Sequence, residues 1–60
     1  QQLTFDQQQV YDWVAAHPQI SLDNLVRELQ RPISEMAAVL MELELLGWIQ
    51  QLPGKQYQIY

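Results

Sequence analysis

The chain has 60 residues, which is enough for one domain with a small core. It contains no cysteine, which excludes disulfides and thiolate metal sites, and its longest apolar run, residues 36–41, is far shorter than the roughly 20 residues that span a bilayer. Three Lys and Arg residues stand against seven Asp and Glu residues, a balance that disfavours strong binding to DNA phosphates. We therefore expect one soluble, cytoplasmic domain spanning residues 1–60.

The first predicted helix begins at Thr4 and ends near Ala16, and residues 1–3 are interpreted as the end of a linker. Thr4 and Gln7 fit a capping box, in which the hydroxyl accepts from the Gln7 backbone N–H and the Gln7 side chain reaches back. Pro18 forbids continuation of the helix. An apolar stripe at helical spacing ends in His17: Val10, Trp13, Val14 and His17.

The second predicted helix starts after Ser21, whose side chain is expected to act as the N-cap. Before it, Gln19–Ile20 fits a very short strand that pairs with the C-terminal hairpin. The turn at residues 30–32 is short, as a helix-turn-helix requires. The buried side of this helix is predicted from its spacing: Leu22, Leu25, Val26 and Leu29.

The third predicted helix runs to Leu46, and Gly47 follows at a position where a left-handed backbone costs glycine nothing. Pro32 fits the first turn of this helix. Its cap is either Ser34 or Arg31, and the sequence alone leaves both open.

Residues 48–60 predict a two-stranded hairpin. Pro53 and Gly54 occupy the second and third positions of a type II turn between the strands 48–52 and 56–60. A two-stranded hairpin is not stable alone and must pack on the helices. The expected inward side chains are those of Ile49, Tyr57 and Ile59. The predicted fold is mostly α, a winged helix-turn-helix made of a three-helix bundle with a two-stranded β wing.

The third helix has two apolar arcs on a helical wheel. The first arc is the expected core side: Met36, Val39, Leu40 and Leu43. The second arc lies between Glu42 and Glu44 and is the candidate protein-contact face: Ala37, Ala38, Met41 and Leu45. One interpretation has the first helix and the wing cover this second arc as core, and another leaves it free for a second copy or another domain. Readout of the DNA major groove is disfavoured, because that needs polar side chains here.

The remaining polar residues offer few candidates for a catalytic, metal or nucleic-acid site. His17 is the single histidine, so we expect it to cap the first helix rather than to bind a metal. No nucleophile pattern or glycine-rich phosphate loop is present, so we expect no catalytic residue, metal or cofactor. Arg31, Ser34 and Lys55, with the N-terminus of the third helix, are the nucleic-acid candidates. Solubilising surface charge is the simpler role for the two cations.

The C-terminal part of the chain also carries a family resemblance. Residues 43–57, which read LELLGWIQQLPGKQY, resemble the C-terminal winged-helix domain of the DNA-processing protein DprA/Smf. Leu3-Thr4 and residues 20–25 look similar too, and the likeness covers essentially the whole chain. The Leu-Pro-Gly-x-x-Tyr wing is its more specific part.

The resemblance implies a bacterial, cytoplasmic parent protein that binds single-stranded DNA in natural transformation and helps to load RecA. In that family a preceding Rossmann-like domain is the main DNA-binding part and the winged helix is an accessory module, so no site residues follow for this chain. The first hypothesis is therefore a non-catalytic module that contacts the preceding domain, a second copy or RecA. The second is weak nucleic-acid binding through the wing and the N-terminus of the third helix.

Overall fold

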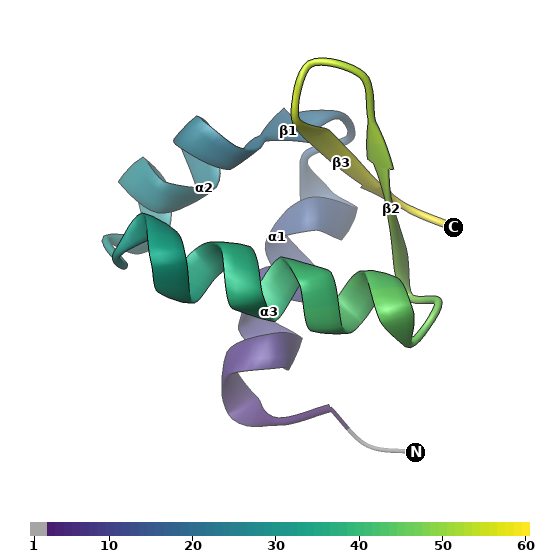
Figure 1. The fold of residues 1–60 in the computed structure, drawn as a ribbon, viewed down its shortest axis with the longest axis horizontal. Coiled ribbons are helices and arrows are strands. Elements are labelled where there is room, and N and C mark those ends of the chain that lie inside the picture. The colour runs from purple at the N-terminus through teal and green to yellow at the C-terminus, as the bar shows by residue number, and fades with distance from the viewer. Residues whose placement is uncertain (1–2) are drawn as a thin grey trace.

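The computed structural model describes residues 3–60 and contains three helices and a small antiparallel sheet, as the predicted winged-helix fold requires (Figure 1). α3 runs across the molecule beneath α2 and in front of α1, and the β2–β3 hairpin stands over its C-terminal half. The elements are, in chain order, α1 (Phe5–Ala16), β1 (Ile20–Ser21), α2 (Leu22–Leu29), α3 (Ile33–Leu45), β2 (Ile49–Leu52) and β3 (Gln56–Ile59).

The two ends of α1 confirm the predicted local signals. The Thr4 hydroxyl accepts from the Gln7 backbone N–H at 3.1 Å, and the Thr4 N–H donates to the Gln7 side chain at 3.0 Å. At the other end, the His17 N–H donates to the carbonyl of Trp13 at 3.0 Å and caps the helix. Leu3 packs against the core, and the remainder of the predicted linker end, residues 1–2, lies outside the described residues.

The sheet has three strands in the order β1-β3-β2. The predicted short strand before α2 exists, but it comprises Ile20 and Ser21, because Gln19 has a left-handed backbone with φ of +64°. Ile20 pairs with Tyr57 of β3. Beside this pair, the carbonyl of Lys55 accepts from the Leu22 N–H at 3.0 Å, so the turn between β2 and β3 is joined to the start of α2.

The start of α3 differs from both predicted caps. Pro32 is the N-cap residue, not a member of the first turn, and its carbonyl accepts from the Met36 N–H at 3.0 Å. Within residues 3–60, no side chain makes a capping hydrogen bond at this helix start. Because the helix begins at Ile33, Ser34 lies inside the first turn and cannot cap it. Arg31 is drawn into contacts with α1 instead.

The end of α3 is a Schellman motif with Leu46 as the C-cap, so the helix ends one residue earlier than predicted, while Gly47 has the predicted left-handed position. Gly47 has φ of +84°, its N–H donates to the Glu44 carbonyl, and the Trp48 N–H donates to the Leu43 carbonyl, each at 3.0 Å. The chain therefore reverses from α3 into β2 through a left-handed residue.

Replacing Gly47 tests this reversal. Among the described residues, a Cβ at Gly47 would meet no atom within 4 Å apart from its two chain neighbours, so the cost of Gly47→Ala comes from the left-handed backbone. We expect the free energy of unfolding to fall by about 1 kcal/mol in urea denaturation. Gly47→Asn should lose less, because asparagine tolerates this conformation better. Equal losses for the two variants would contradict the explanation.

The core lies between α3, α1, α2 and the sheet. Ile49 and Tyr57 are buried as predicted, but Ile59 is exposed. Ile59 is the last residue of β3, and strand alternation predicts the face of a side chain but not whether the helices still cover it there. The buried residues are Val10, Val14, Ile20, Leu25, Met36, Val39, Leu40, Leu43, Ile49 and Tyr57.

Candidate protein-contact face on helix α3

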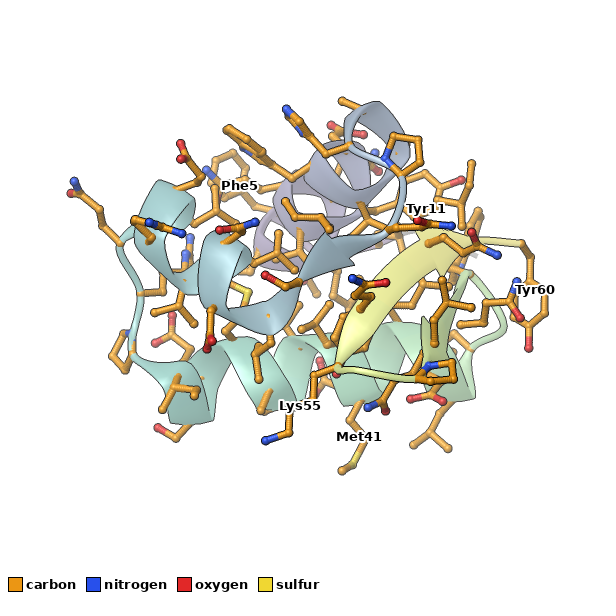
Figure 2. The ribbon with its side chains drawn as sticks, turned by 90° about the horizontal axis from the view of Figure 1, so that it is seen from above. Phe5, Tyr11, Met41, Lys55 and Tyr60 are labelled. Atoms are coloured by element: carbon orange, nitrogen blue, oxygen red, sulfur yellow. The ribbon has the colours of Figure 1, made fainter. Side chains whose placement is uncertain are left out.

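The two arcs of α3 have opposite environments. All four residues of the predicted core arc are buried, from Met36 to Leu43. Ala37 and Ala38 are exposed, and the side chains of Met41 and Leu45 are 62% and 81% exposed. The interpretation in which α1 and the wing cover this second arc is therefore wrong. Figure 2 shows Met41 pointing away from the body of the molecule.

The exposed arc is longer than the sequence indicated. Ile33 is 55% exposed and stands four residues before Ala37, at the interval that also separates Ala37, Met41 and Leu45. The four-residue interval could have placed Ile33 on this arc from the sequence. It was not recognised because the sequence left the first residue of the helix open. We define the α3 stripe as the exposed apolar set on this helix: Ile33, Ala37, Ala38, Met41 and Leu45.

Carboxylates border the α3 stripe on both sides. On the α1 side, Glu42 accepts a hydrogen bond from the Gln7 side chain at 3.0 Å, which fixes its position. On the sheet side, Glu44 is near Tyr57, and burial together with this carboxylate raises the pKa of Tyr57 above its ordinary value. The stripe is therefore an apolar surface with an acidic border.

Arg31, a predicted nucleic-acid candidate, is engaged inside the fold. Its Nη2 donates to Asp6 at 2.9 Å and to Gln9 at 3.0 Å, and its Nη1 donates to Glu35 at 2.9 Å. The hydrogen bonds to Asp6 and then to Glu35 raise the pKa of Arg31. Two carboxylates thus neutralise its charge, and its clearest role is to hold the turn before α3 against α1.

The other two nucleic-acid candidates are exposed on separate elements. Ser34 lies in the first turn of α3, and Lys55 lies at the tip of the wing. Lys55 has φ of +58°, and Figure 2 shows its side chain extending toward the same side of the molecule as Met41. Lys55 therefore places an exposed positive charge on the same side of the molecule as Met41.

A second surface feature, which the sequence did not indicate, is an open groove of about 580 Å³ between the end of α1 and α2. Trp13 and His17 stack in it with ring centroids 4.6 Å apart, and Arg27 bonds to Asn24 at its edge. Both rings of the stack belong to α1 and its cap. The other tryptophan, Trp48, is half-buried and meets Tyr11 edge to face, with ring centroids 5.5 Å apart.

Within residues 3–60, no helix has the length and apolar character to cross a membrane. The same residues contain no cluster of three or more His, Asp or Glu side chains suited to a metal ion.

The comparisons with known proteins agree with this architecture. The family model of the DprA winged helix domain matches residues 1–55. Neither the curated proteins nor the solved structures gave a match to the chain.

Proposed function

Because the chain belongs to the DprA winged helix domain family, we propose that it is a non-catalytic accessory module of a bacterial, cytoplasmic DNA-processing protein. The parent protein would bind single-stranded DNA and help to load the RecA recombinase in natural transformation and DNA recombination. The module itself would work through protein contacts made by the α3 stripe. The proposed partners are a preceding Rossmann-like domain of the same protein, a second copy, or RecA.

The exposure of the α3 stripe is the observation that carries this proposal. Met41 and Leu45 stand in solvent at the centre and end of the helix that a DNA-reading winged helix places in the major groove. Apolar side chains at these positions cannot make the hydrogen bonds by which proteins distinguish base edges. A contiguous exposed apolar surface is instead typical of a contact between proteins.

Weak nucleic-acid binding through the wing and the α3 N-terminus is the second candidate. Lys55 and Ser34 are exposed and favour it, whereas the pairing of Arg31 with Asp6 and Glu35 removes one of its cations. The net charge of −4 also opposes it, since phosphate binding depends on several Lys and Arg contacts.

A titration with fluorescent single- and double-stranded DNA separates the two candidates. At about 150 mM salt we expect no saturable binding to this chain below roughly 100 μM, because so few cations face solvent. Micromolar binding that weakens with salt and disappears in Lys55→Glu would support the second candidate over the first. Arg27→Glu, which changes the net charge equally on α2, is the matched control.

A further inference from the structure

We propose that the partner of the α3 stripe is an amphipathic helix whose apolar side is flanked by Lys or Arg residues. The inference rests on the proposed protein-contact role and adds the chemistry of the occupant. It follows from the shape of the stripe, the charge on its border and the area it offers.

The shape of the stripe fits a helix. α3 has 13 residues and is therefore about 20 Å long, or three to four turns. The small residues Ala37 and Ala38 stand in the sequence between the larger exposed residues Ile33 and Met41. A second helix laid along this surface would place apolar residues at helical spacing against it, as helix-in-groove recognition does.

The border of the stripe selects positive charge. In the part of the chain that the structure describes, the ion pairs join Arg31 to Asp6 and Glu35, so Glu42 and Glu44 have no cation as partner. The bond from Gln7 holds Glu42 in place beside the stripe. A basic residue on each side of a docked helix would meet one of these carboxylates, and complementary charges set specificity and orientation at such contacts.

A second copy fits the same surface poorly. Packing two stripes face to face would bring the Glu42 and Glu44 carboxylates of both copies together, and like charges at an interface are unfavourable. A stable interface also buries about 800 Å² on each partner and involves roughly 20–30 residues a side. The whole surface of the described chain is 4031 Å², and the stripe supplies five side chains of one helix. The repulsion between carboxylates and the small area of the stripe therefore favour a weak contact with a single basic helix over a stable dimer.

Two designed peptides of about 15 residues, slightly longer than the 13 residues of α3, test the inference. Both carry a leucine stripe at helical spacing and a fluorescent label; lysines flank the stripe in one and glutamates replace them in the other. We expect the lysine peptide to bind this chain in the micromolar range by fluorescence anisotropy, and the glutamate peptide to bind at least about tenfold more weakly.

Variants of the chain distinguish docking from unspecific charge attraction. Met41→Glu makes the chain more acidic, so unspecific attraction of the lysine peptide would strengthen, whereas docking on the stripe should weaken about tenfold or more. Glu44→Lys should weaken the binding of the lysine peptide about fivefold. Glu28→Lys makes the same charge change in the groove between α1 and α2 and should stay within about twofold. Circular dichroism verifies that each variant remains folded.

Three results would overturn the inference: equal binding of the two peptides, undiminished binding to Met41→Glu, or equal effects of Glu44→Lys and Glu28→Lys. If neither peptide binds while the chain forms a dimer that Met41→Glu dissociates in sedimentation, the occupant is a second copy and the proposed function stands. If neither peptide binds and the chain instead binds DNA in a manner that depends on Lys55, the proposed function fails with it.

Discussion

Leu43→Ala is expected to lower the free energy of unfolding by about 3 kcal/mol, whereas Leu45→Ala, two residues further along α3, should change it by less than about 0.5 kcal/mol. The Leu43 side chain is fully buried and Leu45 is 81% exposed, so the same substitution removes core packing at one position and solvent-exposed surface at the other. In a domain this small, about 3 kcal/mol is a large part of the total stability.

Urea denaturation followed by far-UV circular dichroism measures both variants under identical conditions. The Leu43→Ala midpoint should fall clearly, and the Leu45→Ala midpoint should match that of the unchanged chain. Similar losses for the two variants would mean that Leu45 is packed in solution, and the α3 stripe would then be part of the core rather than a contact face.

Leu45→Glu is expected to weaken the contact with the proposed partner domain at least about tenfold, because an unpaired carboxylate would be buried against apolar side chains. The effect would be measured by isothermal titration with the preceding Rossmann-like domain produced as a separate protein. Stability should be nearly unchanged, since the side chain at this position faces solvent.

The matched control for this change is Ala15→Glu, which adds one negative charge at an exposed position of α1. It should leave the affinity within about twofold. An equal loss of affinity for Ala15→Glu and Leu45→Glu would show that net charge governs the contact, and an unchanged affinity for both would place the contact elsewhere on the chain.

The features of the fold that depend on neighbouring residues could be predicted from the sequence. The capping box at Thr4, the N-cap at Ser21 and the glycine at the end of α3 are each decided within a few residues, so the helix ends were placed to within one or two positions. The core arc of α3 was also predictable, because its four apolar residues repeat at helical spacing.

Features that depend on distant residues could not be predicted in this way. Arg31 binds Asp6, 25 residues earlier, and no local pattern distinguishes that role from a cap or a phosphate contact. Spacing likewise could not say whether Met41 and Leu45 are covered, because their exposure depends on where α1 and the wing pack. The candidate face was therefore identified by its residues in the sequence, while its exposure and the addition of Ile33 required the structure.

Amide NMR spectra of this chain, alone and with the proposed partner domain, show whether the α3 stripe is the contact surface. Both spectra report every backbone N–H, so they locate the contact without any substitution. We expect shifts concentrated on α3 between Ile33 and Leu45, with little change at the wing tip around Lys55. Shifts confined to the wing tip and the turn at residues 30–32, with α3 unchanged, would contradict it.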